Sequence, residues 1–196
     1  MKRIAILGSG IGNNYKAIVN YFSLKQSKPD ITLISNNLKA DMLEFAKDAN
    51  LKHFYLPDEE FGEFFSTQEF DLIVLDYLSC ELPASVLELG RFINIHPSLL
   101  PAFKGKDAIA RAFNAGVKVS GVTVHTLTDD IEDGKILAQF PVLIGSLTHF
   151  DEFETEIHKL EQRLYPIVIE KILEDKVFDF SDLISEGGCG NCGGCG

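Results

Sequence analysis

The chain has 196 residues, of which 45% are hydrophobic, and its formal net charge at pH 7 is −11. This charge argues against a nucleic-acid backbone as the main partner, because such backbones are bound by clustered Lys and Arg. The sequence contains no run of about 18 apolar residues, so a transmembrane helix is not expected.

Strand-like and helix-like segments alternate along the first half of the chain. The predicted strands are residues 3–8, 31–36, 51–56, 70–76 and 92–95, and the predicted helices are residues 13–25, 39–49, 58–66, 83–89 and 107–115. Further on, residues 118–127 and 135–143 are typical of two paired strands, and residues 150–175 carry apolar side chains at helical spacing. Helices between successive strands predict an α/β fold with a mostly parallel central sheet and a long C-terminal helix.

The N-terminus, MKRIAIL, combines two basic residues with a short apolar run, and GSGIGNN follows at once. This apolar run is too short for a signal peptide, so we interpret it as the first strand and expect a cytoplasmic protein. Residues 1–180 are expected to form one domain, and residues 181–196 a flexible tail rich in Gly and Cys.

A glycine-rich loop, residues 8–14, joins the first predicted strand to the first predicted helix. Gly8, Gly10 and Gly12 permit close backbone approach, and the free N–H groups at the helix start suit a phosphate. The G-x-G-x-G spacing falls short of a dinucleotide fingerprint, and SNN stands where that fingerprint has an acidic residue. Two interpretations remain, a monophosphate site and a tight turn without a ligand.

A second motif, NIHPSLLP at residues 94–101, follows directly on an apolar strand end. Pro97 stops the strand ladder, so His96 is expected at the carboxyl end of a strand, where α/β sheets bind their ligands. On these residues alone, His96 is either a catalytic group or a loop residue satisfied by the backbone. His125 lies inside a strand-like run, and we interpret it as structural.

Together, NIHPSLLPAFKG (94–105) and GVTVHTLTDDIEDGKILAQ (121–139) resemble the folate-dependent formyltransferases, and this resemblance extends over residues 1 to about 175. It implies a Rossmann-like formyltransferase fold and an enzyme that moves a formyl group from 10-formyltetrahydrofolate to an amine. In the branch that acts in purine biosynthesis, the small-molecule acceptor is glycinamide ribonucleotide. The alternatives are a relative with another acceptor, such as an amino sugar nucleotide, and a non-catalytic relative that binds a ligand or handles a metal.

The resemblance also implies which residues are catalytic. Asn94 and His96 match the family's catalytic asparagine and histidine, whose N–H groups can stabilise an oxyanion while the histidine relays a proton. The family's third catalytic residue is an aspartate. A gap-free alignment places Glu132 at that position and Asp133 one residue later. Three alternatives remain open. Glu132 takes the role of the catalytic aspartate, Asp133 takes it through a shifted loop, or the activity is weak.

For the two substrates, the resemblance implies two groups of binding residues. Gly12, Asn13 and Asn14 match the loop that binds the acceptor's phosphate, and Glu161 matches a glutamate that contacts the acceptor. The folate-binding stretch corresponds to residues 76–82, and the residues expected to contact the folate are Ser79, Cys80, Glu81, Leu82 and Asn94. Two departures affect these sites: Tyr77 replaces a usual glycine, and residues 54–90 contain no Lys or Arg where an arginine is expected.

The last ten residues, GGCGNCGGCG, contain three cysteines at C-x2-C-x2-C spacing: Cys189, Cys192 and Cys195. Thiolates at this spacing can converge on Zn²⁺ or an Fe–S cluster. A closed zinc site needs four ligands, however, and no further Cys or His lies nearby. The pattern therefore favours a flexible, reactive tail over a built metal site.

Overall fold

The computed structural model describes residues 1–10, 12–127, 134–145 and 148–179. Its elements in chain order are β1 (Arg3–Gly8), α1 (Asn14–Ser23), β2 (Asp30–Ser35), α2 (Asp41–Asp48), β3 (Lys52–Tyr55), the 3₁₀ helix η1 (Asp58–Glu60), α3 (Phe61–Thr67), β4 (Leu72–Asp76), α4 (Ala84–Leu87), β5 (Phe92–His96), α5 (Ala108–Asn114), β6 (Val119–Thr126), β7 (Ile136–Leu143) and α6 (Phe150–Leu173). The predicted order of strands and helices is confirmed, with ends that shift by a few residues. The predicted helix 58–66 is divided between η1 and α3.

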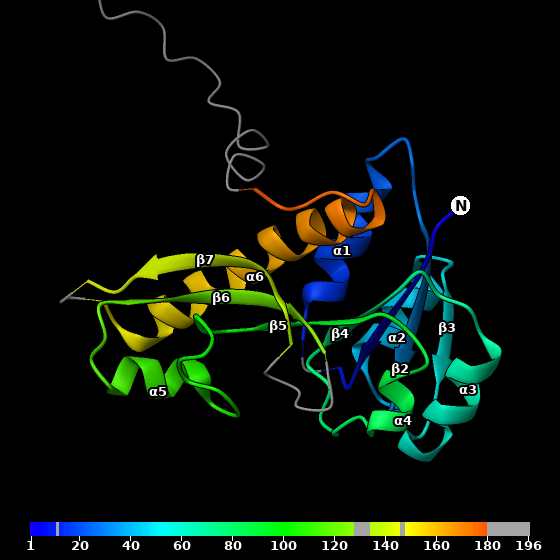
Figure 1. The fold of residues 1–196 in the computed structure, drawn as a ribbon, viewed down its shortest axis with the longest axis horizontal. Coiled ribbons are helices and arrows are strands. Elements are labelled where there is room, and N and C mark those ends of the chain that lie inside the picture. The colour runs from blue at the N-terminus through cyan, green and yellow to red at the C-terminus, as the bar shows by residue number, and fades with distance from the viewer. Residues whose placement is uncertain (11, 128–133, 146–147, 180–196) are drawn as a thin grey trace, which may run out of the picture.

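The central sheet has the strand order β3-β2-β1-β4-β5-β6-β7 (Figure 1). Strands β1 to β5 are parallel, whereas β6 pairs antiparallel with β5 and β7 antiparallel with β6. The chain builds the sheet outward from β1 in one direction and then, from β4, in the other. The strand order therefore reverses between β1 and β4, and in open α/β sheets ligands bind in the crevice at this point.

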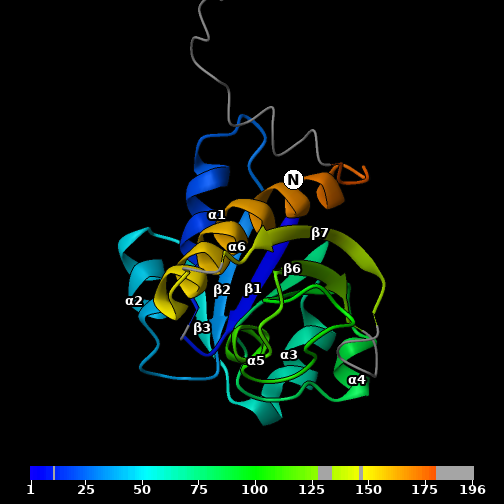
Figure 2. The same cartoon turned by 90° about the vertical axis from the view of Figure 1, so that its left-hand side faces the viewer.

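Helices cover both faces of the sheet (Figure 2). Along β1, the alternate side chains of Ile4 and Ile6 pack in one apolar cluster with residues of α1, α2, α5 and α6. Ala5 and Leu7 belong to a second cluster, which includes residues of α3 and α4. Because the strands are buried on both faces, they read in the sequence as continuous apolar runs.

One buried hydroxyl group of the long helix α6 contacts the backbone in the middle of the sheet. Tyr165 is fully buried, and its hydroxyl lies 3.0 Å from the Leu75 carbonyl of β4 and 3.1 Å from the Ile93 carbonyl of β5. The ladder pairs between β4 and β5 end at Val74 and Ile93. The Tyr165 hydroxyl therefore supplies a partner to backbone groups where the two strands diverge.

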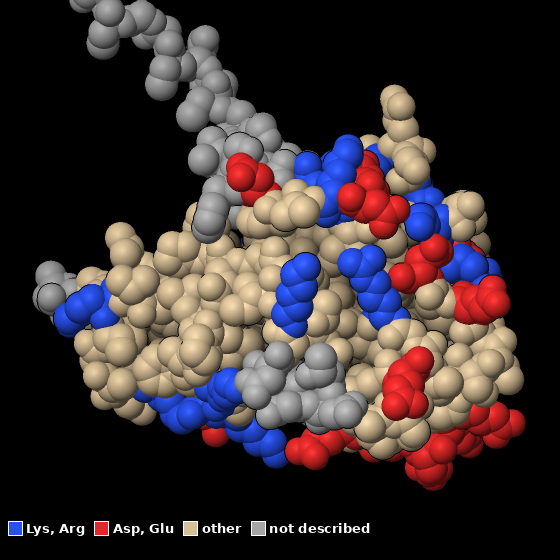
Figure 3. Space-filling model, in the orientation of Figure 1, with Lys and Arg blue, Asp and Glu red and all other residues tan. Residues whose placement is uncertain are grey.

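Charge is distributed unevenly over the surface. Asp and Glu side chains gather at the end of the molecule formed by α3 and α4 (Figure 3), in the segment 54–90 that lacks Lys and Arg. Within the described part of the chain, no helix is long and apolar enough to cross a membrane.

Candidate active site

The carboxyl ends of β1, β4 and β5 lie next to one another at one edge of the sheet, and two cavities open there. The first, which we call the α6 cavity, has a volume of about 380 Å³ and lies between the glycine loop and α6. The second, the β5 cavity, has a volume of about 610 Å³ and lies against the ends of β4 and β5. Both cavities are lined by Tyr77, Pro97, Asp107 and Ala108, so ligands in the two cavities would be neighbours.

The β5 cavity contains residues that were predicted from two separate motifs. It is lined by Ser79, Cys80, Glu81, Leu82, Asn94 and His96, together with apolar side chains that include Leu75, Leu78, Leu87 and Leu127. The structure thus brings the predicted folate-binding stretch beside the predicted catalytic pair. The volume and the largely apolar lining are typical of a small-molecule site.

His96 is held in a defined orientation at the end of β5. Its side chain is almost completely buried, and Nε2 lies 3.0 Å from the carbonyl oxygen of Phe103. Because a carbonyl oxygen only accepts hydrogen bonds, Nε2 is the donor in this contact. The guanidinium of Arg111 donates to the same Phe103 oxygen at 2.8 Å and also to the carbonyl of Lys104. The loop that orients His96 is therefore itself held in place by a side chain of α5.

Asn94 and His125 lie opposite each other in the antiparallel register of β5 and β6. Asn94 is partly exposed and lines the β5 cavity. His125 is fully buried, lines neither cavity, and its Nδ1 lies 3.0 Å from the Thr126 carbonyl, as expected for a structural residue. Glu132 and Asp133 lie outside the described residues, so the choice between these two carboxylates stays a prediction.

A polar network ties the segment after β4 to the glycine loop. The Ser79 backbone N–H donates to Ser9 Oγ at 2.8 Å, and Ser9 Oγ in turn lies 2.7 Å from Asn36 Oδ1. Asn36 Nδ2 donates to Asp58 and lies 3.6 Å from the Cys80 sulfur. Burial and the Asp58 carboxylate raise the pKa of the Cys80 thiol to about 11. Cys80 is therefore a neutral wall residue of the β5 cavity rather than a reactive thiolate.

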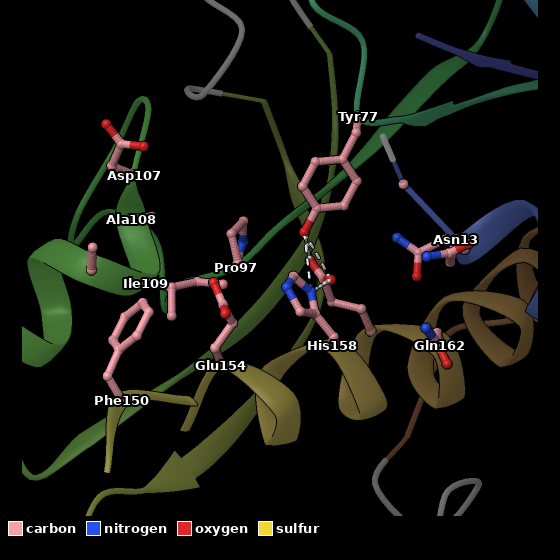
Figure 4. Close-up of a pocket in the computed structure, with 14 residues that line it drawn as sticks. Asn13, Tyr77, Pro97, Asp107, Ala108, Ile109, Phe150, Glu154, His158 and Gln162 are labelled. Carbon is pink, nitrogen blue, oxygen red and sulfur yellow. Dashed lines mark hydrogen bonds and ion pairs between the residues drawn. The ribbon is translucent and has the colours of Figure 1, made fainter. Parts of the chain in front are cut away.

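Residues from the glycine loop and α6 line the α6 cavity, including the predicted acceptor-binding residues Gly12, Asn13, Asn14 and Glu161 (Figure 4). Carboxylates are common in this lining, where Asp107 and Glu154 accompany Glu161. Among the described residues that line the cavity, none is Lys or Arg, and His158 is the one side chain that can become cationic.

Tyr77, His158 and Glu161 form a hydrogen-bonded group inside the α6 cavity (Figure 4). Glu161 is almost completely buried, and its carboxylate accepts hydrogen bonds from the Tyr77 hydroxyl at 3.0 and 3.2 Å. His158 Nδ1 lies 2.9 Å from the same carboxylate, and this hydrogen bond raises the pKa of His158. Tyr77 therefore satisfies a buried charge and also forms part of the wall between the two cavities.

The substitution Glu161→Gln tests this group by removing the negative charge while keeping the side-chain shape. We expect the pKa of His158 to fall, because the hydrogen bond to Glu161 is the largest cause of its increase and the charge of Glu161 adds to it. An NMR titration of the histidine rings measures it, with the His158 signal assigned from a His158→Gln variant. His53, whose Nδ1 contacts the Leu51 carbonyl on β3, serves as the reference and should not change. An unchanged His158 pKa would show that the ion pair does not form in solution.

One charged group of the site was missed by the reasoning from sequence. Asp76 ends β4, is only 1% exposed and accepts a hydrogen bond from the Tyr15 backbone N–H at 2.9 Å. Burial raises the pKa of Asp76 to about 6, and the charge of Glu161 acts in the same direction. A single acid at the carboxyl end of the apolar strand LIVLD was the signal that could have revealed it.

The hypothesis of a metal site falls outside the described residues, because Cys189, Cys192 and Cys195 belong to the segment 180–196. Within the part of the chain that the structure describes, no group of three or more His, Cys, Asp or Glu side chains is placed to hold a metal ion. The proposed boundary between a domain of residues 1–180 and a tail likewise stays a prediction.

Comparison with known proteins defines the class of this chain. A family model described as "Formyl transferase" matches residues 2–169, and the chain therefore belongs to the formyl transferase family. Among individual relatives, "Phosphoribosylglycinamide formyltransferase" of Bacillus subtilis (strain 168) is 35% identical over 188 residues, which are 88% of this chain and 95% of the relative. The enzyme of the same name from Haemophilus influenzae is 32% identical and covers 90% of both chains.

Solved structures extend this similarity to the fold. The phosphoribosylglycinamide formyltransferase of Bacillus halodurans superposes with a TM-score of 0.81 at 33% identity, covering 88% of this chain and 95% of the other. Glycinamide ribonucleotide transformylase 1 of Geobacillus kaustophilus gives a TM-score of 0.82 at 32% identity, covering 88% and 99%. The resemblance inferred from the sequence motifs and the α/β fold that it implied are thus confirmed.

Proposed function

We propose that this protein transfers a formyl group from 10-formyltetrahydrofolate to the primary amine of glycinamide ribonucleotide, a step of purine biosynthesis, and that it acts in the cytoplasm. The observation that carries this proposal is the junction of the two cavities beside the end of β5. The names of the relatives support the choice of acceptor. In this proposal the folate occupies the β5 cavity and the acceptor the α6 cavity.

The reaction joins the acceptor nitrogen to the formyl carbon and breaks the bond between that carbon and N10 of the folate. Attack by the amine places negative charge on the formyl oxygen. The side-chain N–H of Asn94 stabilises this charge, and so does His96 through Nδ1–H, because its Nε2–H already donates to Phe103. The attacking amine loses a proton and N10 gains one, and His96 relays this proton. The hydrogen bond from His96 to Phe103 supports this role because it holds the imidazole beside the cavity.

Each substrate finds groups of the appropriate kind in its cavity. The β5 cavity offers apolar side chains for a pterin ring and backbone groups of residues 79–82 for its polar edge. In the α6 cavity, Glu161 can accept a hydrogen bond from the acceptor, and the start of α1 offers backbone N–H groups for a phosphate.

The test is an assay of the purified full-length chain with 10-formyltetrahydrofolate and glycinamide ribonucleotide. We expect equal amounts of tetrahydrofolate and formylated acceptor, measured by absorbance and mass spectrometry, with no product when either substrate is omitted. Turnover of the folate without formylation of this acceptor would contradict the proposed acceptor. No turnover with any primary amine would contradict formyl transfer itself.

A further inference from the structure

A buried carboxylate lies directly behind the glycine loop, and the proposed reaction does not use it. Asp76 Oδ2 accepts the hydrogen bond from the Tyr15 N–H, whereas Oδ1 has no hydrogen-bond partner among the described residues. Gly12 separates this carboxylate from the α6 cavity by its backbone alone. A Cβ atom at Gly12 would collide with Asp76 Oδ1 and with the ring of Tyr77.

The N–H group that Asp76 occupies belongs to the first turn of α1. Amides in the first turn of a helix have no partner within the helix, which is why helix starts bind phosphate. Tyr15 lies two residues after Asn13, which lines the α6 cavity, and it follows Asn14 directly. The carboxylate of Asp76 therefore already supplies the negative charge that a phosphate would bring to this helix start.

The charges of the α6 cavity increase the effect of Asp76. Its lining contains the carboxylates of Asp107, Glu154 and Glu161, with no Lys or Arg among the described lining residues. A phosphate in this cavity meets repulsion from these acids, which is strong because part of the site is buried. The N–H groups at the start of α1 are then its main attraction, and Asp76 competes for one of them.

We propose that Asp76 is a specificity-determining residue of the acceptor site, whose carboxylate competes with the acceptor's phosphate for the Tyr15 amide and becomes protonated when a phosphorylated acceptor binds. This inference rests on the proposed function, because it concerns the phosphate of the same acceptor. On protonation the carboxyl group takes one proton from solvent. It then gains an O–H donor, which suits a phosphate oxygen, and its remaining carbonyl oxygen holds the Tyr15 N–H less strongly than the charged carboxylate does.

The groups that face Asp76 determine the direction of its pH dependence. Tyr15 on α1, Tyr77 after β4 and Tyr165 on α6 all have raised pKa values and stay neutral. Glu161 on α6 adds a negative charge that favours protonated Asp76, and Asp41 on α2 acts on Tyr15. With its pKa at about 6, Asp76 is protonated below that pH and ionised above it. The KM for a phosphorylated acceptor should therefore increase above pH 6, by at most about tenfold per pH unit.

The experiment measures kcat and KM for glycinamide ribonucleotide from pH 5.5 to pH 8 in the wild type and in Asp76→Ala. At pH 8 the variant should have a KM lower by about tenfold or more, because an unoccupied Tyr15 amide then bonds a charged phosphate. At pH 5.5 the two KM values should approach each other, and kcat should change little at either pH. Comparing the two proteins at each pH cancels the titration of the acceptor's own phosphate.

Two controls separate the effect of Asp76 from general changes. Glu88→Gln removes one exposed acid that lines neither cavity and should leave the KM unchanged. The glycinamide ribonucleoside, which lacks the phosphate, should bind to wild type and Asp76→Ala with equal affinity. An equal KM for the ribonucleotide in both proteins at pH 8, with kcat retained, would overturn the inference while the proposed function stands.

Calorimetric titration with glycinamide ribonucleotide is used if neither the wild type nor Asp76→Ala formylates this acceptor. The missing activity would contradict the proposed function but would leave the role of Asp76 to be decided by binding. Tighter binding of the ribonucleotide by Asp76→Ala than by wild type at pH 8 would still support the role of Asp76, and equal or undetectable binding in both would overturn it.

Discussion

Replacing His96 with alanine should lower kcat by about 10² to 10⁴, with smaller changes in the KM of either substrate. The reason is that, in the proposed reaction, His96 acts on the charge and proton of the reacting groups, which differ most between ground state and transition state. The loop beside it should keep its position, because Arg111 donates to the same Phe103 oxygen that His96 contacts. Steady-state kinetics with both substrates varied independently provide the measurement.

His53→Ala is the matched control for this substitution. His53 lies on β3, partly exposed, and lines neither cavity, so kcat should not change. Thermal unfolding of both variants verifies that each remains folded. Full transfer activity in His96→Ala would mean that the reacting carbonyl lies elsewhere.

The substitution Asp76→Asn should raise the free energy of unfolding at pH 8 by about 3 kcal/mol and leave it almost unchanged below pH 4. The pKa of Asp76 is about 6 in the folded protein, above the ordinary aspartate value of 3.8. The folded state therefore favours the protonated group, and this stability is lost as pH rises from about 4 to 6. Above pH 6 the wild type carries a buried charge that asparagine lacks, while the amide oxygen still accepts from the Tyr15 N–H.

Chemical denaturation at pH 4, 6 and 8 checks this prediction, and Asp71→Asn provides a control with the opposite sign. Asp71 accepts a hydrogen bond from the Arg3 backbone N–H and pairs with Lys2, and the pKa of Asp71 is lowered. A lowered pKa stabilises the folded state above the unfolded pKa, so Asp71→Asn should destabilise the protein at pH 8. Destabilisation at pH 8 by Asp76→Asn would show that the ionised carboxylate is well compensated.

Much of the fold could be predicted because its determinants are local. The buried strands are apolar runs bounded by turn residues, and the predicted first strand, residues 3–8, coincides with β1. The position of His96 was predictable as well, since Pro97 follows it directly and the strand ends there. The division of residues 58–66 into η1 and α3 was not predicted, because one acidic and aromatic run is compatible with both kinds of helix.

The contacts that define the α6 cavity could not be derived from the sequence, because they join residues far apart in the chain. Tyr77 and Glu161 are separated by 84 positions, and Tyr15 and Asp76 by 61. Periodicity indicates which face of an element is buried, but not which polar group meets another inside. The sequence therefore shows Tyr77 only as a departure from the usual glycine of the folate-binding stretch, whereas in the structure its hydroxyl donates to Glu161.

The buried hydroxyl of Tyr165 has a mechanical consequence for both cavities. It lies between the carbonyls of Leu75 and Ile93, where the ladder between β4 and β5 has ended. It thus sets the distance between β4 and β5 near their carboxyl ends. Tyr77 follows β4 there, and His96 ends β5. The same helix carries Glu161 one turn earlier. A displacement of α6 along its axis would therefore change both cavities together. It would move Glu161 in the α6 cavity and, through Tyr165, the strand ends that line the β5 cavity.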